Sequence, residues 1–219
     1  MWETIGRWSS NVQIMPTMIN LYNRDCMEAL KEFKDNQFDL AIVDPPYGIK
    51  NRMQGSKYFG QQSKNMDWNL NIPDKQYFVD LLRISKNQII WGANYYANLL
   101  PNVRDWLVWD KLQGDLNFSM HELAWTSFDR VPKILRYQTL RGNRKRIHPC
   151  QKPIKLYEDI LIRYANTGDK ILDTHLGSGS IAIACHNLGY DLTGYEIDKE
   201  YFEAANKRIN QHKEQKRLF

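Results

Sequence analysis

Short apolar runs alternate with amphipathic segments from one end of the 219-residue chain to the other. A short apolar run is typical of a buried strand, whereas apolar residues spaced three and four apart are typical of a helix. Chains with this alternation fold as a mostly parallel sheet with helices on both faces. The sequence therefore predicts the α/β fold class, and its length fits one domain over residues 1–219.

Seven apolar runs are the expected strands, and they cover residues 18–22, 38–43, 88–91, 105–109, 121–127, 170–172 and 192–195. A long C-terminal helix is expected to begin after Asp198, whose side chain can cap it. The other expected helices cover residues 26–34, 74–86, 154–164 and 180–188.

The composition narrows the class of protein. A formal net charge of +5 and a sequence pI of ≈ 9.0 suit a polyanionic partner such as DNA. The three cysteines show no CxxC spacing and the histidines no ligand-like spacing, so we expect neither disulfides nor a metal site. Since no apolar run approaches the roughly 18 residues of a membrane helix and no signal peptide is evident, we expect a cytoplasmic protein without membrane contact.

Three acidic residues, Asp44, Asp173 and Glu196, fall at the carboxyl ends of expected strands. In an open α/β sheet this edge is where ligands bind. We therefore expect the three side chains to border one site.

Residues 171–180 form a glycine-rich turn between a strand and a helix. Gly177 and Gly179 let the backbone turn sharply and approach a ligand closely. Glu196, at the end of the next strand, can accept hydrogen bonds from both hydroxyls of a ribose. The same residues also fit the dinucleotide fingerprint G-x-G-x-x-A with its later acidic residue, so a nicotinamide-dependent dehydrogenase is one alternative.

Asp173 discriminates between these two ligands. A carboxylate directly before the turn would repel a pyrophosphate, yet it can pair with the ammonium of a methionine moiety. The sequence therefore favours a nucleoside ligand with a cationic end.

The tetrapeptide Asp44-Pro45-Pro46-Tyr47 follows a buried strand. The prolines fix the backbone and leave the Pro45 carbonyl free to accept a hydrogen bond beside the Asp44 carboxylate. Two acceptors that hold an aromatic amine favour a pyramidal nitrogen whose lone pair can attack a methyl sulfonium, while Tyr47 can stack on the base. Asp44 is thus assigned to orientation and electrostatic stabilisation more than to proton abstraction. The alternative is a rigid turn without a catalytic role.

These motifs resemble the β-class DNA amino-methyltransferases of restriction-modification systems and phages, in which the catalytic motif precedes the cofactor turn. The resembling pieces are Asn23 to Cys26, Asp44 to Tyr47, His148 to Pro153, Asp173 to Ser180 and Tyr195 to Asp198. The resemblance implies a single Rossmann-like methyltransferase domain with circularly permuted motif order, a mostly parallel seven-stranded sheet and S-adenosyl-L-methionine as cofactor. One departure is that Thr174 and His175 stand where the family usually has proline and phenylalanine.

The resemblance also implies a role for individual residues. Asp25 would contact the adenine amine of the cofactor, residues 151–153 would pack on its methionine end, and Glu196 would hold the ribose. The full set of expected cofactor-binding residues is Asp25, Cys26, Gln151, Lys152, Pro153, Asp173, His175, Gly177, Ser178, Gly179, Glu196 and Ile197.

The first residue of the tetrapeptide bears on the base. In the family an aspartate is commoner in enzymes that act on adenine N6 and a serine in those that act on cytosine N4, so N6 of a flipped-out adenine is the expected target. Cytosine N4 is an alternative. Methylation of RNA or of a protein amide is disfavoured, because the cofactor turn usually comes first in those families. A non-catalytic DNA-binding relative is disfavoured by the intact acidic residues.

The densest basic stretch covers residues 129–147, and we expect it to be a short target-recognition segment that contacts phosphates. The alternative is a solvated surface loop. Because the segment is short, a homodimer could supply further contacts, and a separate restriction endonuclease is an open partner. The expected DNA-binding residues are Lys57, Arg136, Arg141, Arg144, Lys145 and Arg146.

Overall fold

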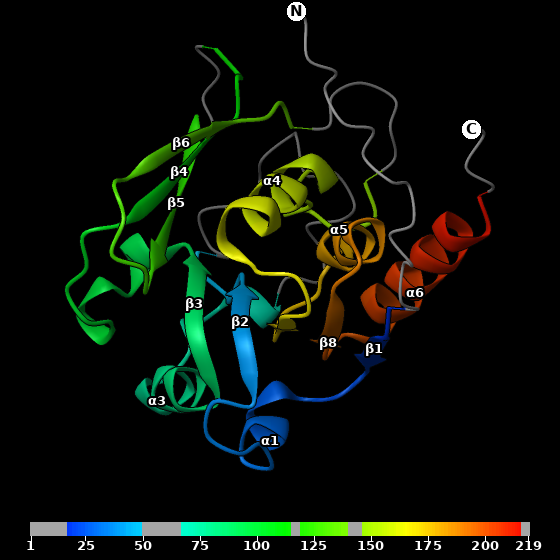
Figure 1. Cartoon of the computed structure of the whole chain (residues 1–219), viewed down its shortest axis with the longest axis horizontal. Helices are drawn as coiled ribbons and strands as arrows, with labels where there is room; N and C mark the ends of the chain where they lie inside the picture. Colours follow the sequence, from blue (N-terminus) through cyan, green and yellow to red (C-terminus); the bar gives the residue numbers. More distant parts are fainter. Residues whose placement is uncertain (1–16, 50–66, 115–118, 140–145, 216–219) are drawn as a thin grey trace, which may run out of the picture.

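The structure is a computed structural model that describes residues 17–49, 67–114, 119–139 and 146–215. One sheet runs through it in the strand order β1-β8-β7-β2-β3-β5-β4-β6 (Figure 1). One end of the sheet carries β5, β4 and β6, and the other carries β1 with helix α6 beside it. The strands are β1 (Ile19–Tyr22), β2 (Phe38–Val43), β3 (Ser85–Trp91), β4 (Trp106–Asp110), β5 (His121–Thr126), β6 (Lys133–Arg136), β7 (Lys170–Asp173) and β8 (Asp191–Tyr195).

The sheet is mostly parallel, as the sequence predicts, but in the described part of the chain it has eight strands instead of the expected seven. The additional strand, β6, lies inside the basic segment 129–147 and pairs in parallel with β4. Strand β5 runs antiparallel to both of its neighbours, β3 and β4. A strand of four residues with only one of them buried lacks the apolar run by which a strand is recognised, which is why the sequence does not predict β6.

Helices cover both faces of the sheet, as predicted. Alternate residues of β2 point to opposite faces, so Leu40 and Ile42 pack in one core cluster while Ala41 and Val43 pack in the other. The first cluster includes α4 (Ile154–Tyr164), α5 (Ser180–Leu188) and α6 (Lys199–Glu214). The second includes α1 (Cys26–Leu30) and α3 (Lys75–Ile84). Within the described residues, no helix combines the length and the apolar character needed to cross a membrane.

Helix α1 ends at Leu30, four residues earlier than expected. The cause is Arg83, whose guanidinium donates to the carbonyl oxygens of Leu30 (3.0 Å) and Phe33 (2.8 Å). These bonds satisfy carbonyl groups that a longer helix would have used, so the chain turns away toward β2.

The register of the central strands determines where the site lies. Strand β7 pairs in parallel with β2 and with β8, with Ala41 opposite Leu172 and Asp173 opposite Gly194. The carboxyl ends of these three neighbouring strands therefore meet at one edge of the sheet. Asp44, Asp173 and Glu196 are all found at this edge, as predicted.

Candidate active site

A cavity of about 1380 Å³ opens at the carboxyl edge of β2, β7 and β8. Asp44 and Gly177, which come from different strand tips, both line it. A pocket for a single small ligand typically measures roughly 300–1,000 Å³, so this one has room for a nucleoside ligand and a second group beside it. The expected site residues that line it are Asp25, Cys26, Asp44, Pro45, Pro46, Tyr47, Arg146, Gln151, Lys152, His175, Gly177, Ser178, Glu196 and Ile197.

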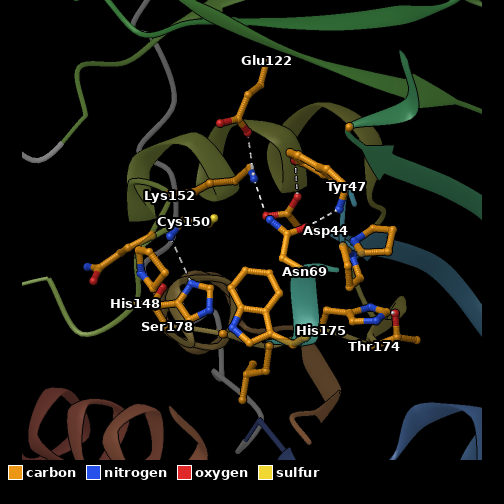
Figure 2. A pocket seen from close by; sticks show the side chains of 18 of the residues that line it. Asp44, Tyr47, Asn69, Glu122, His148, Cys150, Lys152, Thr174, His175 and Ser178 are labelled. Atoms are coloured by element: carbon orange, nitrogen blue, oxygen red, sulfur yellow. Dashed lines mark hydrogen bonds and ion pairs between the residues drawn. The ribbon is translucent and has the colours of Figure 1, made fainter. Parts of the chain in front are cut away.

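The tetrapeptide turn is fixed by the segment that returns to it after β2. The side-chain oxygen of Asn69 accepts hydrogen bonds from the backbone N–H groups of Tyr47 (2.8 Å) and Gly48 (3.1 Å). The Tyr47 hydroxyl donates to Asp44 Oδ1 at 2.5 Å (Figure 2). The Tyr47 hydroxyl therefore occupies one oxygen of the Asp44 carboxylate.

Tyr47 packs closely against Gly92, at the end of β3. A Cβ atom on Gly92 would lie 2.0 Å from Cε1 of Tyr47, and Gly92 has φ +70°, a conformation that side chains disfavour. The ring of Tyr95 stacks on that of Tyr47, with centroids 5.0 Å apart. Glycine at position 92 thus allows the aromatic ring of the tetrapeptide to lie against the sheet edge.

The other oxygen of Asp44 contacts a buried lysine. Lys152 Nζ lies 2.5 Å from Asp44 Oδ2 and 3.0 Å from Glu122 Oε2, and Lys111 Nζ lies 2.6 Å from Glu122 Oε1. Figure 2 shows Lys152 pointing between the two carboxylates. The four residues form a row of alternating charge, in the order Lys111, Glu122, Lys152 and Asp44. Their formal charges add up to zero.

The pKa values in this row reflect competition between burial and charge. Burial alone would lower the pKa of Lys152, but the carboxylates of Asp44 and Glu122 raise it well above its ordinary value. Burial would raise the pKa of Glu122, yet Lys152 and Lys111 lower it to about 2. Burial raises the pKa of Asp44, with Lys152 acting in the opposite direction.

The glycine-rich turn is held by a hydrogen bond to Asp173 and by packing against α6. Asp173 is only 2% exposed and does not itself line the cavity, and its Oδ1 accepts the backbone N–H of His175 at 3.0 Å. Burial raises the pKa of this carboxyl group to about 8. Gly179 has φ +68°, and a Cβ atom there would lie 2.9 Å from Ile209 of α6, so only glycine fits without a shift. Pro153 also lies outside the cavity lining, as the N-cap residue of α4.

Glu196 lies next to the turn with both carboxylate oxygens accepting backbone donors. Oε2 accepts the N–H of Gly177 at 2.8 Å, and Oε1 accepts the N–H of Asp198 at 2.9 Å. A carboxylate oxygen can accept more than one hydrogen bond, so the predicted binding of ribose hydroxyls stays compatible with these contacts. Burial raises the pKa of Glu196.

Asp25 and Cys26 border the cavity from the start of α1. Asp25 Oδ1 accepts the backbone N–H of Met27 at 2.8 Å and so caps the helix. The Cys26 thiol is buried, and burial raises its pKa to about 12.

The two residues that depart from the family turn form a polar chain beneath it. Thr174 Oγ1 lies 2.7 Å from the Tyr77 hydroxyl and 2.8 Å from His175 Nδ1, and His175 Nε2 lies 4.0 Å from Cys26 Sγ. Burial lowers the pKa of His175 to about 4, so its ring is neutral near pH 7. Thr174 therefore makes a hydrogen bond to Tyr77 that the family's proline could not make.

The expected DNA contacts are described only in part. Arg136 is on β6, with its side chain 63% exposed and its Nε 3.5 Å from Asp110 Oδ2. Arg146 lines the cavity. The other expected DNA-binding residues, Lys57, Arg141, Arg144 and Lys145, lie outside the described residues.

Two charged residues of the site are not predicted from the sequence, Glu122 and Lys111. Strand β5 runs antiparallel, so its first residues lie at the edge where β2 and β3 end. The sequence does show that Glu122 is a charged residue within the expected strand 121–127. The direction of that strand, which brings Glu122 to the site, cannot be predicted from the sequence. The side chain of Lys152 is predicted to pack on a cofactor, and the structure places its ammonium on Asp44.

A family model and a known methyltransferase sequence both match this chain. The family model N6_N4_Mtase, described as DNA methylase, matches residues 88–207, which is more than half of the chain. The Type II methyltransferase M.HpaI of Haemophilus parainfluenzae is 26% identical over 234 residues, covering 85% of this chain and 72% of that protein.

Two solved structures share the fold. The M1.HpyAVI–SAM complex superposes with a TM-score of 0.61 at 23% identity, over 88% of this chain and 100% of that one. The PvuII DNA methyltransferase, described as cytosine-N4-specific, superposes with a TM-score of 0.60 at 14% identity, over 90% of this chain and 92% of that one.

Proposed function

The chain belongs to the DNA methylase family of N6 and N4 amino-methyltransferases, and within that family we propose that it transfers a methyl group from S-adenosyl-L-methionine to N6 of adenine in DNA. One observation carries the proposal. Asp44 and the glycine turn at Gly177 come from different strand tips and line the same cavity. An amine held at Asp44 and a methyl donor held at the turn would therefore meet inside one pocket.

The residues around the turn fit the cofactor. Glu196 has its carboxylate at the turn, where ribose hydroxyls can donate to it, and Asp173 places a carboxyl group behind the turn for a ligand ammonium. When bound, S-adenosylmethionine supplies a methyl group activated by a sulfonium. The predicted roles of Asp25, Gln151, Ser178 and Ile197 are supported by their places in the cavity wall.

In the proposed reaction, residues of the chain bind and orient the base. The amine of a flipped base replaces the Tyr47 hydroxyl as the hydrogen-bond donor to Asp44 Oδ1, and the tyrosine ring then offers a face for stacking. The Pro45 carbonyl is the second proposed acceptor. A base held inside the pocket is shielded from water, which strengthens these hydrogen bonds.

Adenine is favoured over cytosine by the aspartate at position 44, because enzymes resembling this chain with an aspartate there act more often on adenine N6. The likeness to the cytosine-N4-specific PvuII enzyme, at 14% identity, concerns the fold. Residues 129–147 are proposed to contact DNA phosphates, with a second copy of the chain as a further source of contacts and a separate endonuclease as a functional partner.

The product of the reaction tests the proposal. Purified protein is incubated with DNA and isotope-labelled S-adenosylmethionine, and the DNA is digested to nucleosides for mass spectrometry. We expect labelled N6-methyldeoxyadenosine, and none from an Asp44→Ala variant that still binds the cofactor. Labelled N4-methyldeoxycytidine would overturn the choice of base, and the absence of any labelled nucleoside would overturn the proposed activity.

A further inference from the structure

Lys152 touches both halves of the site. Its ammonium lies 2.5 Å from Asp44 Oδ2, at the catalytic strand tip. Its backbone carbonyl accepts the hydroxyl of Ser180 at 2.8 Å, at the start of the helix that follows the cofactor turn. One residue therefore connects the end of β2 to the turn after β7.

The ammonium of Lys152 is buried among the described residues. Its side chain is 2% exposed, and Nζ lies 3.0 Å from Glu122 Oε2 and 5.1 Å from the centre of the Trp91 ring. Burying a charged group is costly unless oppositely charged groups compensate it. An apolar side chain of similar length would fill this volume without that cost, so packing alone gives no reason for a lysine here.

Glu122 determines where the Lys152 ammonium can lie. It is itself held by Lys111 at 2.6 Å and so cannot follow Lys152 freely. With Oδ2 of Asp44 bound to Lys152, the Asp44 carboxylate has one rotational position, which directs Oδ1 to the Tyr47 hydroxyl.

We propose that Lys152, held in place by Glu122, is a positioning residue for methyl transfer, which fixes the Asp44 carboxylate as a hydrogen-bond acceptor aimed at the amine of the base. The inference rests on the proposed function. An ionised carboxylate only accepts hydrogen bonds, whereas a protonated one also donates and would compete for the lone pair that must attack the methyl group. Lys152 favours the ionised form through its charge.

The effect on Asp44 can be measured because few charged groups of the described residues surround it. Tyr47 contacts it from its own turn, and Lys152 and Glu122 act on it with opposite charges. Titratable groups of the other elements packed around Asp44 also interact with it. They are Tyr77, Tyr96, Cys150, Tyr157 and Asp173.

The first experiment follows the carboxyl carbon of Asp44 by NMR in protein labelled with 13C-aspartate, with the signal assigned through Asp44→Asn. In Lys152→Gln the pKa of Asp44 should rise by roughly one to three units, because the opposite charge has been removed. In Glu122→Gln it should fall, since a like charge has been removed. Lys155→Gln removes an equal charge from the exposed first turn of α4 and should leave the pKa of Asp44 unchanged.

The second experiment measures methyl transfer. Lys152→Gln should lower kcat by about a hundredfold and move the acid limb of the pH–rate profile to higher pH, with affinity for S-adenosylmethionine within threefold of the wild type. Glu122→Gln should move the acid limb the opposite way. It also keeps the shape of its side chain, so it carries the test if Lys152→Gln does not fold.

Shifts in the same direction in both variants, or none in either, would overturn the inference. If the wild-type chain transfers methyl groups and the titrations are unshifted, only this inference fails. A wild-type chain that transfers no methyl group overturns the proposed function, and with it the role of Lys152 in the reaction.

Discussion

At the scale of single residues, Asp173 carries a buried carboxyl group whose pKa is raised to about 8 by burial. The unfolded chain has an ordinary aspartate pKa of about 3.9. Between these two values the folded protein binds more protons than the unfolded one, so stability falls as pH rises through this window. At neutral pH the folded protein therefore holds a carboxyl group that is mostly protonated and costs stability, beside a turn predicted to bind a cation.

Asp173→Asn should therefore stabilise the protein without ligand and weaken cofactor binding. At pH 7 we expect a gain on the order of a few kcal/mol, or a Tm about 5–10 °C higher, because the amide keeps the hydrogen bond from His175 and, unlike the carboxyl group, does not stabilise the unfolded chain by ionising there. The difference in Tm between variant and wild type should grow from pH 5 to pH 8. Affinity for S-adenosylmethionine, measured by calorimetry, should fall by about tenfold or more. A Tm difference that does not change with pH would contradict this account of Asp173.

Gly92 provides a second test at this scale. In Gly92→Ala the new methyl group would overlap the Tyr47 ring and the backbone would be strained, so we expect the ring to be displaced from Asp44. The turnover of DNA should fall by at least tenfold, while the affinity for S-adenosylmethionine stays within threefold. Gly168→Ala is the matched control, because that glycine also has a positive φ but no atom of the described residues lies within 4 Å of the place its methyl group would take. Equal losses in both variants would show that backbone strain, and not the position of Tyr47, is responsible.

At the scale of elements, the sequence predicts most of what positions the site. Helix α4 has its predicted limits because Pro153 marks its start, and α5 because glycines flank it. The three acidic strand tips lie together, as predicted, because parallel strands share an edge.

The elements that the sequence does not predict depend on tertiary contacts. Strand β6 has the sequence Lys-Ile-Leu-Arg, and its pairing with β4 is not visible in such a short, exposed segment. The antiparallel direction of β5 leaves no mark in the pattern of apolar residues, so the sequence alone cannot place Glu122 beside Asp44. The shortened α1 depends on Arg83, which is about fifty residues away in the sequence.

The basic segment 129–147 leads to a prediction about salt. Replacing Arg136, Arg141 and Arg144 together by glutamine should weaken DNA binding and lower the slope of log affinity against log salt by up to about 2.7, which is roughly 0.9 for each phosphate that the variant no longer neutralises. Fluorescence anisotropy with a labelled duplex at several salt concentrations measures both. Lys207→Gln, on the exposed side of α6, should change neither. An unchanged slope in the triple variant would mean that the segment is a solvated surface.

At the scale of the whole molecule, one cavity joins elements from distant parts of the chain. Its wall includes Asp25 at the start of α1, Glu122 on β5 and Tyr201 on α6. Because ligands that bind only the folded state stabilise it, a ligand in this cavity should raise the stability of the entire domain.

S-adenosylmethionine at a hundred times its Kd should add about 2.7 kcal/mol and raise Tm by roughly 5–10 °C. A nicotinamide dinucleotide at the same concentration should leave Tm unchanged, because the Asp173 carboxyl group can ionise in favour of a cationic ligand but offers no favourable charge to a pyrophosphate at the turn. Glu196→Gln should reduce the shift caused by S-adenosylmethionine. A larger shift with the dinucleotide would favour a dehydrogenase instead.

The central claim is that the tip of β2 and the turn after β7 bring a DNA base and a methyl donor together. A crystal structure of the protein with a DNA duplex and an unreactive analogue of S-adenosylmethionine tests it most directly. The account predicts a flipped adenine with N6 within about 3.2 Å of an Asp44 carboxylate oxygen, and the analogue against the turn at Gly177. A base bound away from Asp44, or an analogue bound away from that turn, would contradict it.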